Sequence, residues 1–332
     1  MARTGLADVL VVSSSPHIRA PESVSRIMWD VNLALVPAAF AAVYFFGLPA
    51  LMTIVITVLS CVIFESLLLR LLGKPIRVSD GSAVVTGLLL AFNLPPTVPW
   101  WLAVAGGFIA MLLGKHLYGG LGSNPFNPAL VARVVLFIAW PSFMTTFPAP
   151  FGGTGGADAI STATPLNLLK SDINMGLHLK SSASVSLTDL IAGNVPGCLG
   201  EVSALALLLG AGYLFIRKVI SWHIPVAYIG TVVVYSGIYW LIDSTAYASP
   251  AFHLFAGGLM LGALFMATDM VTSPVTKKGM LIFGFGCGLL TMIIRFYGGY
   301  PEGVSFSILF MNALTPLIDK FTKPKVLGEI KK

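Results

Sequence analysis

Residues 49–72 read PALMTIVITVLSCVIFESLLLRLL, and this stretch decides the fold. Its only charged residues are Glu65 and Arg70, and a helix needs about 20 residues to cross a hydrocarbon core of ~30 Å. The whole chain of 332 residues has the same character, with 56% hydrophobic residues, 10% charged residues and a mean hydropathy of +0.87. Soluble domains carry roughly 25% charged residues. The composition therefore excludes a water-soluble globular protein and predicts a polytopic membrane protein.

Further apolar runs of similar character lie on both sides of this stretch. Each is bounded by Gly, Pro or charged residues, as expected for membrane helices. The additional predicted spans are 27–47, 81–95, 99–117, 127–142, 201–219, 222–242, 250–268, 279–296 and 303–319. The runs 81–95 and 127–142 are too short to cross alone. The sequence thus predicts an all-α fold with about ten transmembrane helices.

The distribution of basic residues predicts the orientation of these spans. With the N-terminus in the cytoplasm, 16 of the 20 Lys and Arg residues fall on the cytoplasmic side, as the positive-inside rule requires. Both termini are then cytoplasmic and the long polar loop is extracytoplasmic. The basic residues form short clusters between apolar runs rather than one stripe, so we expect no nucleic-acid partner. The predicted segments are an N-terminal segment 1–26, five helices in 27–142, the loop 143–200, five helices in 201–319 and a basic tail 320–332.

Two short matches suggest an internal repeat. The sequence HLYGG at 116–120 resembles RFYGG at 295–299, and GSAVVTGLLLA at 81–91 aligns with GGLMLGALFMA at 257–267. Because five spans separate the copies, the second copy enters the membrane from the opposite side. This predicts two inverted five-helix repeats, an architecture that places a binding pathway near the membrane centre. The alternative is a chance resemblance between Gly-rich apolar segments.

A few ionisable residues lie within or beside the spans. Charge inside a membrane is costly and usually faces a cavity, so Glu65 and Asp269 are candidates for an ion path. Arg133 is expected either to pair with a carboxylate or to contact phosphate oxygens. The chain has three cysteines and no CxxC pair, and an iron–sulfur or zinc site needs about four soft ligands. We therefore expect no metal site built by this chain alone.

The polar loop contains the sequence DAISTATPL at residues 158–166, after a Gly-rich tract. From residue types alone it is a Ser/Thr turn, in which Thr164 could cap a helix beginning at Pro165. The segment also resembles the D-x-x-[S/T]-G-A-T flavinylation motif, in which a flavin transferase uses FAD to link FMN through its phosphate to the final Thr. The resemblance implies Thr164 as the acceptor, with Asp158, Ser161 and Ala163 as recognition positions. Thr162 stands where the motif usually has Gly.

The resemblance extends over nearly the whole chain. The sequences VSSSPHIR at 12–19, IM at 27–28, ALVPA at 34–38 and SNPFNPA at 123–129, together with ten spans, are similar to the family of the Rnf complex D subunit. This family also contains the B subunit of the Na+-translocating NADH:quinone oxidoreductase, and its fold is urea-transporter-like. Membership implies a subunit of an ion-translocating ferredoxin:NAD+ oxidoreductase in a bacterial or archaeal cytoplasmic (inner) membrane.

The same resemblance implies the cofactors and partners. The expected cofactors are covalent FMN and, as a further expectation, a second, non-covalent flavin such as riboflavin. The expected partners are other Rnf subunits with iron–sulfur centres and flavins, a flavin transferase, and Na+ or H+. Flavins accept one or two electrons, so Thr164 would be an anchor and the chemistry would belong to the cofactor. The alternative function is a secondary transporter or channel for a small solute, which needs no flavinylation motif.

Overall fold

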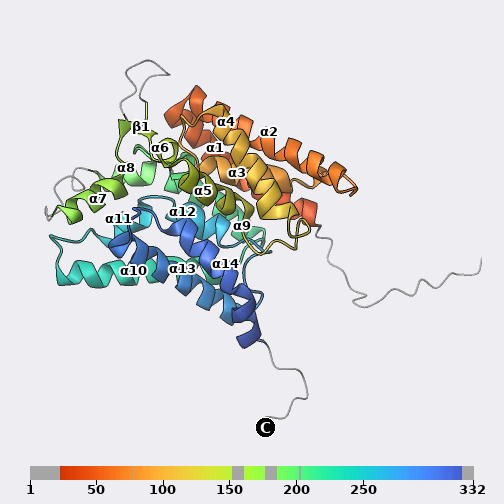
Figure 1. Ribbon diagram of the computed structural model, residues 1–332. Helices are drawn as coiled ribbons and strands as arrows, with labels where there is room; N and C mark the ends of the chain where they lie inside the picture. Colours follow the sequence, from red (N-terminus) through yellow and green to blue (C-terminus); the bar gives the residue numbers. More distant parts are fainter. Residues whose placement is uncertain (1–22, 77, 152–160, 176–184, 202, 324–332) are drawn as a thin grey trace, which may run out of the picture.

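The computed structural model describes residues 23–76, 78–151, 161–175, 185–201 and 203–323, and it is mostly helical (Figure 1). Within this part of the chain, five helices are long and apolar enough to cross a membrane. They are α1 (Val24–Phe46), α2 (Leu48–Leu71), α10 (His223–Ile242), α13 (Lys277–Tyr297) and α14 (Val304–Phe321). These five agree with five of the predicted spans to within a few residues.

Shorter apolar helices occupy the other predicted spans. They are α3 (Ser82–Phe92), α4 (Trp100–Ile109), α5 (Pro128–Ala139) and α9 (Ala204–Ile216). A π-helix, η2 (Ala110–His116), continues α4 without a break, and the 3-10 turn η1 (Val78–Asp80) precedes α3. Hydroxyl or amide side chains cap several helix starts: Ser23 accepts from the amide of Arg26, Asn127 from Ala129, and Thr276 from Gly279. These caps satisfy backbone donors that the first turn leaves free.

The predicted span 250–268 is not one helix. It divides into α11 (Pro250–Phe255), α12 (Leu259–Leu261) and the π-helix η5 (Gly262–Met266). The break falls at Gly257, whose φ of 73° lies in the left-handed region that glycine adopts without strain. Gly81, which precedes α3, has a similar φ of 80°. Apolar composition alone concealed this interruption, because the residues on both sides of the break are equally hydrophobic.

The helices pack through small residues. Helix α2 lies against α3 and α4, and α10 lies against α13. Two further contacts join the halves of the chain: α1 packs against α9, and α5 packs against α14. At the α1–α9 crossing, a Cβ on Gly210 would lie 2.0 Å from the carbonyl oxygen of Ala34. At the α2–α3 crossing, a Cβ on Gly87 would lie 2.7 Å from the Cα of Val58. Glycine therefore permits these backbones to approach closely, as in other membrane helix pairs.

The polar loop folds into short elements at one end of the helix bundle, on the left in Figure 1. We call this the loop end. It carries α6 (Pro141–Met144), an antiparallel pair of β1 (Phe147–Pro148) and β2 (Ser161–Thr162), α7 (Pro165–Asn174), α8 (Leu187–Ala192) and the 3-10 turn η4 (Leu199–Glu201). A small apolar cluster, which includes Leu166, Leu190 and Phe252, packs α7 and α8 onto α11. The start of α1 and the end of α14 lie at the opposite end, which we call the terminal end.

Candidate functional site: two cavities at opposite ends of the bundle

Thr164 is the N-cap of α7. Its hydroxyl oxygen accepts a hydrogen bond of 3.3 Å from the backbone amide of Asn167, and Pro165 occupies the first helical position. The preceding segment is held by the β1–β2 pair, in which Ser161 lies opposite Pro148. The capping interpretation of Thr164 is therefore confirmed. Ala163 is exposed beside it, whereas Asp158 lies outside the described residues.

Thr164 lines a cavity at the loop end, which we call the Thr164 cavity. The cavity has a volume of about 930 Å³ including its open mouth. Aromatic rings from three elements form much of its wall: Tyr300 stacks on Phe306 with ring centroids 5.5 Å apart and meets Phe137 edge to face at 5.2 Å. Such rings offer flat apolar surfaces to a planar ligand.

Charged side chains form another part of this wall. Arg133 of α5 donates from Nη1 to Oδ1 of Asn93 at 2.6 Å, and its Nη2 forms an ion pair with Glu302 in the connection between α13 and α14. The other carboxylate oxygen of Glu302 accepts a hydrogen bond of 2.7 Å from the amide of Gly258. Of the two environments expected for Arg133, the structure shows the carboxylate pair. This pair joins the first half of the chain to the second.

Glu201 of η4 lies beside Glu302 and also lines the cavity. Both carboxyl groups approach the same point, because a Cβ on Gly258 would lie 3.4 Å from Oε1 of Glu302 and 3.8 Å from Oε1 of Glu201. Burial and the neighbouring Glu302 carboxylate hold the pKa of Glu201 well above its usual range. Burial alone would raise the pKa of Glu302, but Arg133 and the hydrogen bond from Glu201 bring this pKa to about 2. The ion pair with Arg133 therefore favours the charged form of Glu302, whereas burial favours the neutral form of Glu201.

Helix α7 is attached to the connection that carries Glu302. Lys170 of α7 donates to the carbonyl oxygens of Gly298 and Tyr300, the latter at 3.0 Å. Burial lowers the pKa of Lys170 from its ordinary value. Through Lys170, the helix that begins at Thr164 has a fixed position relative to the Arg133–Glu302 pair.

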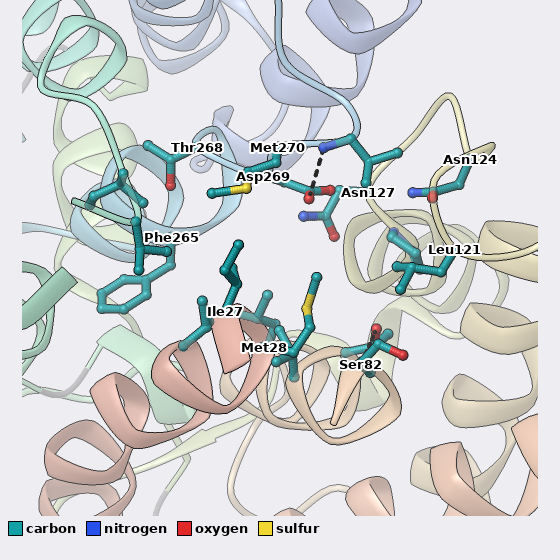
Figure 2. Close-up of a pocket in the computed structure, with 18 of the residues that line it drawn as sticks. Ile27, Met28, Ser82, Leu121, Asn124, Asn127, Phe265, Thr268, Asp269 and Met270 are labelled. Carbon is teal, nitrogen blue, oxygen red and sulfur yellow. Dashed lines mark hydrogen bonds between the residues drawn. The ribbon is translucent and has the colours of Figure 1, made fainter. Parts of the chain in front are cut away.

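A second cavity lies at the terminal end, and Figure 2 shows its lining. We call it the Asn124 cavity; its volume is about 800 Å³ including its mouth. Asn124 donates to the carbonyl of Phe126 at 3.1 Å, and its buried Oδ1 atom has no hydrogen-bond partner within the described part of the chain. Asp269 also lines the cavity and accepts from the amide of Val271 at 3.3 Å, the dashed line in Figure 2. Asn127 donates to the carbonyl of Met266 at 3.4 Å.

A buried ion pair borders the Asn124 cavity. Lys115, at the end of η2, lines the cavity and pairs with Glu65 of α2, and the side chains are 2% and 4% exposed. Lys115 also donates to the hydroxyl of Ser82 at 2.7 Å. His116 is buried beside Glu65, with its Nε2 atom 3.9 Å from Oε1. The sequence indicated a buried role for Glu65, but Lys115 was not identified as its partner.

The structure thus separates the residues that the sequence singled out. Thr164 and Arg133 line one cavity, and Asp269 lines the other. Glu65 does not line the second cavity but accepts a hydrogen bond from Lys115, which does. Sequence analysis did not identify Glu201 and Glu302. The sequence pattern that could have identified them is a single acidic residue at the boundary of an apolar run, since Glu201 begins the run 201–219 and Glu302 directly precedes the run 303–319.

Comparisons with known proteins show the family of this chain. The model of the NQR2, RnfD, RnfE family matches residues 11–328. The chain is 50% identical over 325 residues to the D subunit of the Na(+)-translocating ferredoxin:NAD(+) oxidoreductase complex of Acetobacterium woodii, covering 97% of this chain and 96% of that protein. It is 46% identical over 322 residues to the D subunit of the proton-translocating ferredoxin:NAD(+) oxidoreductase complex of Clostridium ljungdahlii, covering 97% of each. It is 41% identical to the D subunit of an ion-translocating oxidoreductase complex of Halorhodospira halophila, covering 95% of this chain and 94% of that protein. The chain therefore belongs to the NQR2, RnfD, RnfE family.

Proposed function

We propose that this protein is the membrane subunit of an Rnf-type complex that couples electron transfer between ferredoxin and NAD to Na+ or H+ translocation, and that it carries FMN covalently on Thr164. The family membership supports the complex. The position of Thr164, at the start of α7 and in the wall of an aromatic cavity, is the observation that supports the flavin. Bound FMN would supply one- and two-electron redox chemistry, while the chain supplies its position and electrostatic surroundings.

The surroundings of Thr164 fit a phosphate ester. The free amides of a first helical turn attract anions, and α7 has ten residues, with its N-terminus at Thr164. Thr164 is 8% exposed and lines the cavity. An ester at this atom keeps the oxygen available as an acceptor for the amide of Asn167.

The rest of the cavity fits the ring system of a flavin. A planar heteroaromatic ring needs flat apolar walls with a few polar groups, and the cavity offers Phe137, Tyr300 and Phe306 together with Arg133. We therefore assign the ring to the Thr164 cavity and the phosphate to the start of α7.

The test is covalent flavin fluorescence. The chain is expressed with and without a flavin transferase, denatured in SDS and separated on a gel. We expect a fluorescent band for the wild type with the transferase and a dark band for Thr164→Ala. Thr145→Ala is the matched control, because Thr145 lines the same cavity and should leave the band fluorescent. A dark wild-type band would contradict covalent flavin and would favour the alternative of a solute transporter or channel.

We assign the second, non-covalent flavin to the Asn124 cavity. The unpartnered Oδ1 atom of Asn124 is an acceptor for a ligand N–H group, and Asn127 and Asp269 offer further polar atoms around an otherwise apolar space. The dione edge of an isoalloxazine ring presents alternating acceptors and one N–H donor. Flavin extracted from the native chain with acid should include a non-covalent fraction, and Asn124→Leu should lose that fraction while keeping the fluorescent gel band.

The ion path is proposed to pass the Asn124 cavity. Asp269 lines this cavity and Glu65 is bonded to Lys115 in its wall. In vesicles, Asp269→Asn and Glu65→Gln should lower ion uptake driven by electron transfer, whereas Asp189→Asn, at the loop end in α8, should not. Retained uptake in both cavity variants would exclude these residues from the path. Comparing rates with and without Na+ identifies the coupling ion, since the relatives include both Na+- and proton-translocating complexes.

The membrane arrangement follows from the same proposal. Ten spans in two inverted repeats are supported by the equivalent packing of α2 on α4 and of α10 on α13, and by positive φ angles at Gly81 and Gly257. With the termini in the cytoplasm, the Thr164 cavity opens outside the bacterial or archaeal inner membrane, where a covalent tether prevents loss of the flavin. The introduced thiol of Ser186→Cys should react with an impermeant thiol reagent in whole cells. No reaction of this thiol would contradict the proposed orientation, in which the loop end lies outside the membrane.

A further inference from the structure

A third cavity lies at the terminal end, and the proposed function does not use it. We call it the Ser273 cavity; its volume is about 880 Å³ including its mouth. It adjoins the Asn124 cavity, and the two share Val219, Ile220, Thr268 and Met270, of which the last two are labelled in Figure 2. Its own wall adds three polar residues that do not line the Asn124 cavity, namely Lys218, Ser221 and Ser273.

The Ser273 cavity lies where two helices long enough to cross a membrane begin. Ser221 and Ile224 line it on either side of the first residue of α10, and Val275 and Met280 do so at the start of α13. Neither helix has an acidic residue in its first turn, and no described side chain caps α10. The positive ends of two helix dipoles therefore meet at this cavity.

Lys218 adds a full positive charge to the wall. It follows the end of α9 with a φ of 57°, a left-handed conformation that is strained for a residue with a side chain and is usually occupied by glycine after a helix. Lys218 forms no ion pair within the described residues, whereas the neighbouring Arg217 pairs with Asp30 at 3.2 Å. A lysine in place of the favoured glycine indicates that its side chain has a function here.

Two hydroxyl groups of the wall are available to a ligand. Ser273 is 8% exposed and lines the cavity, and its hydroxyl has no hydrogen-bond partner in the part of the chain that the structure describes. Ser221 donates to Sδ of Met280 at 3.2 Å, and a thioether sulfur is a weak acceptor. A buried hydroxyl without a good partner is costly, so both groups favour a ligand with oxygen acceptors.

The nearby carboxylates do not neutralise Lys218. Asp319 of α14 accepts from the amide of Val275 at 3.2 Å, and Asp269 accepts from the hydroxyl of Thr272 at 3.2 Å. Neither carboxylate lines the cavity. The first two residues of α13 are the exposed lysines 277 and 278, and a positive charge at a helix start is unfavourable unless an anion lies nearby.

We propose that the Ser273 cavity binds the phosphate group of an anionic phospholipid, with Lys218, Ser221 and Ser273 as donors to the phosphate oxygens. The remaining wall is apolar and suits the lipid's chains: Val219, Ile220, Ile224, Pro274, Val275 and Met280. Because membrane helices begin here, the cavity lies at the depth of lipid headgroups. Basic pockets between membrane helices bind anionic headgroups in the same way.

The experiment measures lipid binding to the full chain, purified in detergent and depleted of lipid, by mass spectrometry of the intact complex. The probes are phosphatidylglycerol and phosphatidylcholine with the same acyl chains. We expect phosphatidylglycerol to bind at least fivefold more tightly, roughly the effect of one lysine beside an anionic headgroup. Lys218→Asn should abolish this preference and Lys218→Arg should retain it. Equal binding of the two lipids by the wild type would overturn the proposal.

The variants are chosen so that the chain still folds. Asparagine tolerates the left-handed conformation, so Lys218→Asn should unfold at the wild-type temperature when no lipid is present. The matched control is Lys320→Asn, which removes an exposed charge from the end of α14, outside the cavity. It should keep the preference for phosphatidylglycerol. An unchanged preference in Lys218→Asn would overturn the proposal.

Two further arms identify the occupant. Ser273→Ala removes a hydroxyl that has no partner, so it should fold normally and weaken phosphatidylglycerol binding by roughly two- to tenfold; unchanged binding would contradict the site. Inorganic phosphate in excess should not displace the lipid. Displacement would show that the occupant is a free anion and would overturn the lipid assignment. None of these measurements requires a bound flavin, so they remain valid if the flavin proposal fails.

Discussion

Removing Lys115 should destabilise the protein because it leaves a buried carboxylate without its partner. Lys115 and Glu65 pair at the terminal end with side chains 2% and 4% exposed. The Oε2 atom of Glu65 already has no hydrogen-bond partner among the described residues. In Lys115→Met the apolar stem of the side chain is preserved and the charge is lost. The remaining neighbours, Ser82 and His116, cannot replace a full positive charge at this depth.

The expected cost follows from measurements on other buried pairs. Breaking a buried ion pair by removing one partner costs about 3–5 kcal/mol, whereas replacing both partners by apolar side chains is often neutral or stabilising. We therefore expect Lys115→Met to lower the unfolding midpoint by roughly 6–10 °C, at about 2 °C per kcal/mol for a chain of this size. The double variant Lys115→Met/Glu65→Leu should recover most of this loss.

The assay can use the protein's own thiols. Cys61, Cys198 and Cys287 are free and buried, so a dye that fluoresces on reaction with thiols reports unfolding of the purified chain in detergent. Arg70→Met, near the exposed end of α2, is a control that should shift the midpoint little. A double variant as unstable as Lys115→Met, or a single variant as stable as the wild type, would refute the reasoning.

Three further outcomes are expected. Gly257→Ala should lower the free energy of unfolding by about 1–3 kcal/mol, because the φ of Gly257 is 73° and the new Cβ would lie 2.6 Å from Leu166. The control is Gly212→Ala, which has open space around it inside α9 and should be neutral or slightly stabilising. The thiol-dye assay measures both. Lys170→Met should release α7 and lower the fluorescence anisotropy of a flavin on Thr164, with Lys170→Arg retaining it; equal anisotropy in all three chains would contradict the attachment. Tyr228→Phe should cost about 1 kcal/mol, because its hydroxyl bonds to two buried hydroxyl groups that also bond to each other; a loss above about 3 kcal/mol would contradict this.

The apolar pattern predicted most of the helices, because length and composition suffice to mark a segment that crosses a membrane. The start of α5 could also be predicted, since Asn127 before Pro128 is a typical cap. The interruption of 250–268 could not, because a single left-handed glycine leaves no trace in a hydropathy average. The pairing of Thr164 with a helix start was visible in the sequence as Thr-Pro.

The charged cluster of the Thr164 cavity could not be predicted from the sequence. Arg133 and Glu302 are 169 residues apart, and neither residue has a local pattern that indicates its partner. Their contact depends on how α5 and α14 cross, which is decided by side-chain packing between the two halves. Glu201 likewise became informative only when the structure placed it against another carboxyl group.

The π-helix η2 has a consequence for how this chain tolerates length changes. A π-helix closes its hydrogen bonds over one more residue than an α-helix, so it is the structure expected where one residue has been inserted into a regular helix. Deleting Leu113 would let the segment 110–116 return to α-helical geometry, and the residues that follow would keep nearly their present orientation relative to α4. Lys115 would then still face Glu65, whereas one deletion inside a regular helix such as α2 would rotate the following residues by about 100°. The π-helix therefore allows this segment a change of length that a regular helix would not tolerate.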